Sequence, residues 1–348
     1  MKTTPISSLS ISNAMQLTVS NAQTEISKLQ KEAVTGTYAD VGLELGTRTS
    51  TNLDYTRESS RLQSIVDSNA LAEQRMDASQ LALQNMSSSA QTLLNSVIAL
   101  SGNTDASSLS VAATTAKSVL ENFTSYSNTA VNGEYLFSGI NTDAQTLDDT
   151  FIPDITADFN TAFSDYMSSN GIASPADMTA SDMSTFLSDY QDSFNWSDWN
   201  NASVDADGAG TVMSSRISTS ETVSTSTSAN SDGFKSLVLA GVISSQLVDR
   251  GLSSSALAVV NDTTTSLAGA AISGVDTQRA KIGLSQERVE KANTYMSAQK
   301  TIIDTQLTNL IGVDTYEAST RLTTLLNQVE TSYTITSKIQ GLSLVNFL

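Results

Sequence analysis

Two short segments of this 348-residue chain carry side chains at spacings that catalysis or metal binding could use. Segment 297–300 (Ser-Ala-Gln-Lys) matches the S-x-x-K pattern of penicillin-binding enzymes, but the companion motifs of those enzymes are absent. Segment 205–208 (Asp-Ala-Asp-Gly) begins like a calcium loop. Its fifth position is Ala209 and its twelfth is Arg216, where an EF-hand needs Asp or Asn and then Glu. We interpret the first segment as a polar helix face and the second as an acidic turn.

The chain contains no His and no Cys. Ser-His-Asp and Cys-His arrangements are therefore excluded, as are disulfides and the commonest metal ligands. Asp148, Asp149, Asp154 and Asp158 could attract a cation weakly, although a solvated acidic surface is the favoured interpretation. The sequence predicts a protein that is not an enzyme and has no cofactor and no metal site.

The formal net charge is −18, which argues against binding to nucleic acid or to an anionic membrane surface. No apolar run approaches the roughly 18 residues that span a bilayer, so we expect no membrane insertion. The first eight residues contain no apolar h-region, which predicts export without a cleaved Sec-type signal if the protein leaves the cell.

Apolar heptads at both ends of the chain form the best-ordered pattern. The predicted seam positions are Met15, Val19, Ala22, Ile26 and Leu29 near one end, and Leu322, Leu325, Val329, Ile339 and Leu342 near the other. Such seams most often pack within their own chain, and that alternative stays open here. The seams are lined partly by Ala, Ser and Thr, so they bury little apolar area. We therefore expect marginal helices that become ordered on association.

Further helices are predicted between these ends. A linker from Gly36 to about Leu53 leads to a helix over 62–100, where ten of twelve seam positions are apolar, and then to a helix over about 107–131. Asn132-Gly133 then predicts a turn, and Tyr-Leu-Phe at 135–137 predicts a short strand. The helical pattern returns at Ser231, and apolar residues recur at every seventh position from Ile282 to Leu310. Gly312 and Asp314 mark a hinge before the last helix. Antiparallel packing of the two arms would form a rod.

The middle of the chain differs in composition. Residues 118–215 include fifteen acidic residues and no basic one. We predict a mainly α fold: a long antiparallel coiled-coil or helical-bundle rod with an inserted α+β or β-rich outer domain. The predicted domains are 1–45 with 314–348 (terminal assembly), 46–139 with 231–313 (helical rod) and 140–230 (acidic insert). Within the insert, 177–190 suggests a helix and 211–225 alternates like a strand.

Three stretches resemble the flagellin superfamily: 21–36 in the first helix, and 318–325 and 330–348 in the last. The turn after the third helix resembles the hook–filament junction proteins (the third hook-associated protein) of that superfamily through Asn132, Gly133, Tyr135, Phe137 and Gly139. The final Leu-Ser-Leu-Val-Asn-Phe-Leu is similar to their tail. The linker departs from many flagellin relatives because it lacks an Asp-Asp-Pro segment.

The resemblance implies a structural protein of the extracellular bacterial flagellum, exported through the flagellar type III apparatus. It implies a homo-oligomer that joins hook and filament through its terminal helices. The implied partners are a neighbouring hook-associated protein on the hook side, flagellin on the filament side and a flagellar export chaperone. Two alternatives remain: flagellin itself, the filament subunit, and a secreted adhesin-like protein that binds through the acidic insert.

Overall fold

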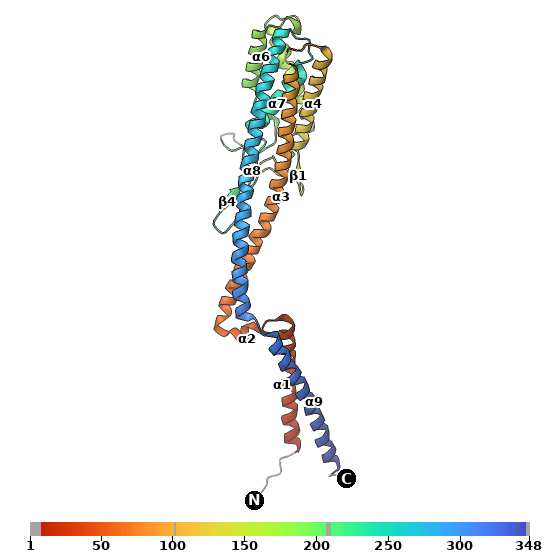
Figure 1. The fold of residues 1–348 in the computed structure, drawn as a ribbon, viewed down its shortest axis with the longest axis vertical. Helices are drawn as coiled ribbons and strands as arrows, with labels where there is room; N and C mark the ends of the chain where they lie inside the picture. Colours follow the sequence, from red (N-terminus) through yellow and green to blue (C-terminus); the bar gives the residue numbers. More distant parts are fainter. Residues whose placement is uncertain (1–7, 101, 207–209, 346–348) are drawn as a thin grey trace. The chain divides into compact units, whose positions relative to one another are not determined.

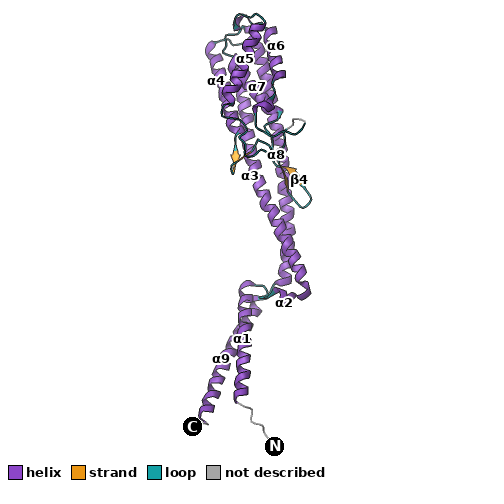
Figure 2. Ribbon diagram, turned by 180° about the vertical axis from the view of Figure 1, so that it is seen from behind, coloured by secondary structure: helices purple, strands orange, loops and turns teal. Residues whose placement is uncertain are grey.

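Long helices make up most of the chain, which confirms the predicted mainly α fold (Figure 2). The computed structural model describes residues 8–100, 102–206 and 210–345, leaving aside the side chains of residues 8, 9, 12 and 339–345. The chain forms two compact units: a terminal unit of Met1–Ser64 with Met296–Leu348, and a central unit of Ile65–Tyr295. Among the described residues, no helix combines the length and hydropathy needed to cross a bilayer.

The terminal unit is built around a pair of helices from the two ends of the chain. It contains α1 (Ser8–Thr35), α2 (Val41–Leu45), a 3₁₀ turn (Gly46–Arg48), the start of α3 (Thr49–Ala99), the end of α8 (Ser254–Ile311) and α9 (Thr315–Val345). α1 and α9 pack side by side (Figure 1). Gly36 directly follows α1, and its φ of +67° is the left-handed conformation that favours glycine after a helix. Asp314 caps α9 by accepting hydrogen bonds from the N–H groups of Tyr316 (2.8 Å) and Glu317 (3.2 Å).

The central unit is a helical bundle with small hairpins. Its further elements are α4 (Ala106–Ser127), β1 (Ala130–Val131), β2 (Glu134–Tyr135), α5 (Phe151–Ser169), α6 (Ala180–Ser193), β3 (Ser214–Arg216), β4 (Thr222–Ser224) and α7 (Asp232–Leu247), with 3₁₀ turns at Pro175–Asp177 and Trp196–Trp199. α3 and α8 run antiparallel within it, since Asn69 bonds Asn293 and Gln80 bonds Arg279. The predicted α3 seam is confirmed: every seam position from Leu62 to Leu100 is buried except Ile65, which is half-buried.

The aromatic residues of the insert share one core with the bundle. The Phe234 ring of α7 lies 5.5 Å from Phe123 and 5.6 Å from Phe137, and Trp196 of the insert lies 6.3 Å from Phe123. Residues 140–230 therefore belong to the central unit. The two observed units divide at 64/65 and 295/296, whereas the sequence-based boundaries were placed at the linker and the hinge, at 45/46 and 313/314.

The insert is mainly helical, so the α+β description fits it better than the β-rich one. The helix predicted near 177–190 is α6, which starts with a capping box between Thr179 and Asp182. The strand-like segment 211–225 contains the β3–β4 hairpin. α5 was not predicted from the sequence, which offers helix and strand signals only for other parts of the insert, and Pro153 lies inside it. That proline stands in the first turn, where its missing N–H has no intrahelical partner to lose.

The Asn132-Gly133 turn is confirmed as a two-residue hairpin turn between β1 and β2. Both residues have positive φ, 54° for Asn132 and 84° for Gly133, as the twist of a tight hairpin requires. The third helix ends at Ser127 rather than at the predicted Val131, because Val131 pairs with Glu134 in this hairpin. The predicted Tyr-Leu-Phe strand is also shorter than expected, since β2 stops at Tyr135.

Candidate assembly interface

The structure brings most of the predicted terminal seam residues together in the α1–α9 pair. Leu29 on α1 is 1% exposed. Ala318, which belongs to the heptad of Leu322 and Leu325 on α9, is 2% exposed. The remaining described members are only half-buried: Met15, Val19, Ala22 and Ile26 on α1, and Leu322, Leu325 and Val329 on α9. The side chains of Ile339 and Leu342 lie outside the described residues. The heptad thus faces the partner helix, but one chain covers it incompletely.

Polar contacts also link the two helices, and the sequence analysis missed them. The Gln23 amide donates to the Tyr333 hydroxyl at 3.1 Å, and the Thr336 hydroxyl donates to the Met15 sulfur at 3.3 Å. Arg321 lies 3.8 Å from Glu25. Thr336 is seven residues after Val329 on the same half-buried stripe. Its heptad spacing could have identified Thr336 as a seam residue, but the seam was defined by apolar residues only and Thr is polar.

Backbone hydrogen bonds hold the upper end of the pair. The Tyr38 N–H donates to the Ile311 carbonyl at 3.0 Å, and the Val313 N–H donates to the Gly36 carbonyl at 2.9 Å. The segments just after α1 and just before α9 are therefore joined like a short antiparallel bridge. These hydrogen bonds set the register in which α1 and α9 pack against each other.

Charged side chains surround the same end. Lys28 donates to Glu44 at 2.7 Å, and this hydrogen bond raises the pKa of Lys28 above its usual value. Glu32 is buried at 5% exposure and accepts a hydrogen bond from the Ala39 N–H at 3.1 Å. A buried carboxylate is costly unless it is paired. These contacts tie the turn after α1 to the helix, so the turn has a defined position.

Apolar surface of the pair remains open to solvent. A groove of about 450 Å³ lies between the helices, lined by Met15, Val19, Tyr333 and neighbouring polar residues. Large apolar side chains also point outward, among them Val34 at 87% and Tyr316 at 81% exposure. Two helices with so little enclosed apolar area gain little from each other alone. The pair therefore leaves apolar surface that one chain does not cover.

Charge is distributed unequally between the units. The terminal unit contains nine basic and ten acidic residues, a net charge of −1. The central unit contains nine basic and 26 acidic residues, a net charge of −17. Copies of the terminal unit can therefore approach one another without strong electrostatic repulsion, whereas copies of the central unit repel.

Family comparisons match both arms of the chain. The model of the bacterial flagellin N-terminal helical region matches residues 6–142, and that of the bacterial flagellin C-terminal helical region matches residues 265–348. The chain belongs to the flagellin family. This family consists of structural proteins of the extracellular bacterial flagellum and is not a known enzyme family, so the chain has a structural flagellar role.

Comparison with solved structures places this flagellin-family chain beside a Vibrio parahaemolyticus protein described as flagellar hook-associated. The TM-score is 0.54 at 14% sequence identity, with 76% of this chain and 97% of the other covered. At this identity the likeness concerns the fold alone. No curated protein sequence matches the chain significantly.

The motif after the third helix lies in the central unit of the flagellin-family chain, not in the terminal pair. Asn132 and Gly133 form the exposed turn, Tyr135 is half-buried, and Phe137 is fully buried, with its carbonyl accepting from the Ala229 N–H at 2.8 Å. Gly139 has a φ of +68°, and a Cβ there would lie 2.6 Å from the Thr211 carbonyl oxygen. The motif thus fastens the insert to the bundle.

The two segments with possible chemistry show no site. Ser297 is exposed on α8, and Lys300 pairs with Asp304 at 2.7 Å. The calcium-like segment lies partly outside the described residues. In the part of the chain that the structure covers, no group of three or more acidic side chains is placed to hold a metal ion. Of the four central aspartates, Asp148 accepts from Asn201 (2.9 Å) and Asp158 from Tyr190 (3.1 Å).

Proposed function

We propose that this protein forms the junction between hook and filament, by self-assembly through its terminal helices. The observation that carries the assembly role is the α1–α9 pair: a half-buried heptad seam in a unit of net charge −1. Additional helices from neighbouring copies would cover the exposed remainder of the seam and so supply the apolar burial that one chain lacks.

Two features favour a junction protein over a filament subunit. The sequence from Asn132 to Gly139 and the final seven residues resemble those of junction proteins. The partners that follow are copies of the chain, a hook-associated protein on one side and flagellin on the other. An export chaperone would hold the C-terminal region before passage through the type III apparatus.

Deleting the gene and examining the cells tests this function directly. A junction protein connects a finished hook to the filament, so its loss should leave intact hooks without filaments and release unpolymerised flagellin into the medium. Electron microscopy of the cells and an assay of flagellin in the medium measure both effects. Loss of filaments with no flagellin in the medium would instead assign the chain to the filament subunits, and normal filaments would reject both roles.

The seam is tested by charge substitutions at its buried and half-buried positions. Leu29→Asp or Leu325→Asp should leave secretion intact, because export takes the unfolded chain, but should prevent stable incorporation by placing a carboxylate in the seam. Gln30→Asp and Thr324→Asp add the same charge to exposed positions of the same helices and are the matched controls. Motility and the amount of protein retained on hooks are the measurements. Incorporation of Leu29→Asp at the control level would contradict the seam.

A further inference from the structure

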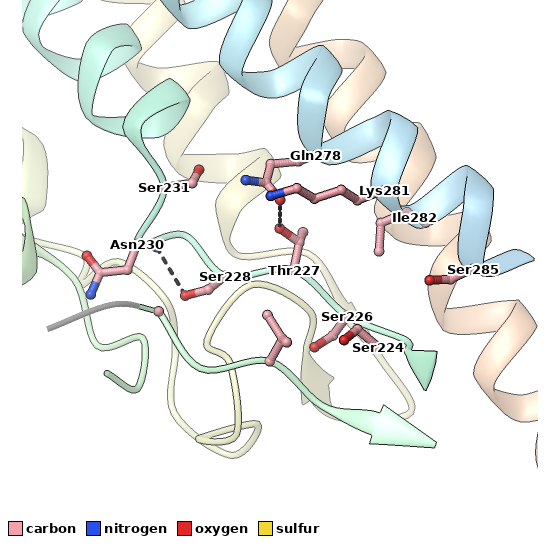
Figure 3. Close-up of a pocket in the computed structure, with 12 residues that line it drawn as sticks. Ser224, Ser226, Thr227, Ser228, Asn230, Ser231, Gln278, Lys281, Ile282 and Ser285 are labelled. Atoms are coloured by element: carbon pink, nitrogen blue, oxygen red, sulfur yellow. Dashed lines mark hydrogen bonds between the residues drawn. The ribbon is translucent and has the colours of Figure 1, made fainter. Parts of the chain in front are cut away.

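A cavity of about 320 Å³ in the central unit goes beyond the assembly role (Figure 3). It lies between α8 and the two extended segments 210–212 and 224–231. Its described lining is mostly hydroxyl and amide groups, and Lys281 is the one charged side chain among those residues. Figure 3 shows Gln278 and Lys281 side by side on α8, facing the start of α7 at Ser231.

Several polar groups at or beside this cavity have no hydrogen-bond partner among the described residues. The Asn230 amide nitrogen and the Ser231 hydroxyl are buried and unpaired. Gln278 accepts from the Thr227 hydroxyl at 2.9 Å through its oxygen, which leaves its amide nitrogen available. Among the described residues, Lys281 has no ion pair. The Asn230 nitrogen and the Ser231 oxygen are too buried to touch a ligand in the cavity, whereas the Gln278 amide nitrogen and the Lys281 ammonium belong to lining side chains and can donate to one.

Two further observations point to the same ligand. Ser285 is 8% exposed and lines the cavity, yet its hydroxyl makes no hydrogen bond to the described protein. Ser231 is the N-cap residue of α7, but its side chain does not cap the helix. The N-terminus of a helix carries partial positive charge and favours anions. The site therefore combines the exposed Lys281 with neutral donors, beside the start of α7, where Asp232 in the first turn offsets part of the positive charge.

The positive charge of this cavity is unusual, because the protein as a whole is strongly acidic. The chain has 36 acidic residues, but none of those that the structure describes lines the cavity. One ammonium group balances one carboxylate group, so a dicarboxylate would place one of its two groups in the cavity and leave the other in solvent; the other donors are neutral. This set suits a carboxylate, whereas a phosphate with close to two charges is usually met by Arg or by several cations.

We propose that this cavity binds a carboxylate group. The carboxylate belongs either to a small organic acid or to an Asp or Glu side chain of a second copy of the chain. The central unit's net charge of −17 means that a second copy brings many carboxylates near any positively charged pocket. Binding of this kind would offset part of the repulsion between central units.

Calorimetric titration of the full-length protein with glutarate tests the proposal. Glutarate should bind, and its uncharged analogue glutaramide should not. Lys281→Met should weaken glutarate binding by about tenfold or more, as expected for loss of a charge-assisted hydrogen bond. Lys291→Met is the control, because Lys291 lies exposed on the same helix and pairs with Glu287 instead. Ser285→Ala gives a second variant that keeps the charge, with an expected loss of about threefold or more.

Three results would overturn the proposal: no heat with glutarate, equal binding of glutaramide, or unchanged affinity in Lys281→Met. Tighter binding of inorganic phosphate than of glutarate would also overturn it. Sedimentation velocity then separates the two sources. If a second copy supplies the carboxylate, glutarate and Lys281→Met should both reduce self-association. Self-association unaffected by either, together with glutarate binding, assigns the site to a small organic acid.

Discussion

Among single residues, Asn69 is the clearest exception to the apolar seam between α3 and α8. It is fully buried, and its amide donates to the Asn293 side-chain oxygen at 2.7 Å and to the Ile217 carbonyl at 2.9 Å. One side chain therefore joins α3, α8 and the β3–β4 hairpin region. A polar residue at one seam position can fix the register of two helices, because other registers leave it unpaired.

Asn69→Ala should destabilise the central unit by about 1–3 kcal/mol, because Ile217 and Asn293 would lose a buried donor. Both tryptophans lie in the central unit, so their fluorescence during urea unfolding reports on that unit. Asn95→Ala, at an exposed position of the same helix, should change the stability by less than about 0.5 kcal/mol. Equal unfolding curves for the two variants would contradict this role of Asn69.

Tyr190 makes the central unit sensitive to alkaline pH. It donates to Asp158 at 3.1 Å, and burial raises the pKa of its phenol well above the usual value. An unfolded chain loses this proton near pH 10, whereas the folded chain retains it. The resulting stabilisation is present below about pH 10 and falls as the pH rises beyond it.

Tyr190→Phe should therefore reduce the loss of stability between about pH 9 and 11, while costing about 0.5–1.5 kcal/mol at neutral pH for the lost hydrogen bond. Urea unfolding across this pH range gives both numbers. Tyr333→Phe is the control, since Tyr333 is 54% exposed and lies in the terminal unit. An alkaline slope unchanged in Tyr190→Phe would show that other groups cause it.

At the scale of elements, α7 and α8 come into close contact where two glycines meet. A Cβ on Gly274 would lie 2.5 Å from the Cα of Gly233, so neither helix can carry a side chain there without moving. Gly274→Ala should destabilise the central unit by about 1–3 kcal/mol through overpacking. Gly269→Ala on the same helix meets no atom within 4 Å and should stabilise it by about 0.5–1 kcal/mol. Urea unfolding separates them; a neutral Gly274→Ala would contradict the close crossing.

Elements with a regular period were predictable from the sequence. The α3 seam and the turn at Asn132 depend on local spacing and backbone preference, and both are confirmed. The linker after Gly36 was predicted too long, because α2 and the start of α3 at Thr49 have no apolar heptad to mark them. α5 was not predicted, because a proline at position 153 is compatible with a helix only when it stands in the first turn, and the start of the helix is not evident from local spacing.

The site was predictable only in part. Heptad spacing placed Leu29 and Leu325 on the facing sides of α1 and α9, as the structure has them. The burial of Glu32 and the bond from Gln23 to Tyr333 depend on pairing between distant parts of the chain. The open cavity beside Lys281 has no sequence signature, since its donors come from three separate segments. Long-range pairing of this kind cannot be inferred from local periodicity.

For the whole molecule, the negative charge is concentrated in the central unit and nearly absent from the terminal unit. The terminal unit carries −1 and the central unit −17, so self-association through terminal helices must overcome repulsion between central units. Added salt shortens the screening length from about 10 Å at 0.1 M to about 3 Å at 1 M. Salt therefore weakens this repulsion and leaves apolar seam contacts largely intact.

Raising NaCl from about 0.1 to 1 M should accordingly strengthen self-association of the full-length chain, measured by light scattering and sedimentation. A variant in which Asp143, Asp165 and Asp192 are changed to Asn should associate more readily at low salt and respond less to NaCl, because these exposed aspartates add to the repulsion. Leu29→Asp should fail to associate at either salt concentration. Association that weakens with salt would mean that ion pairs, rather than the apolar seam, hold the copies together.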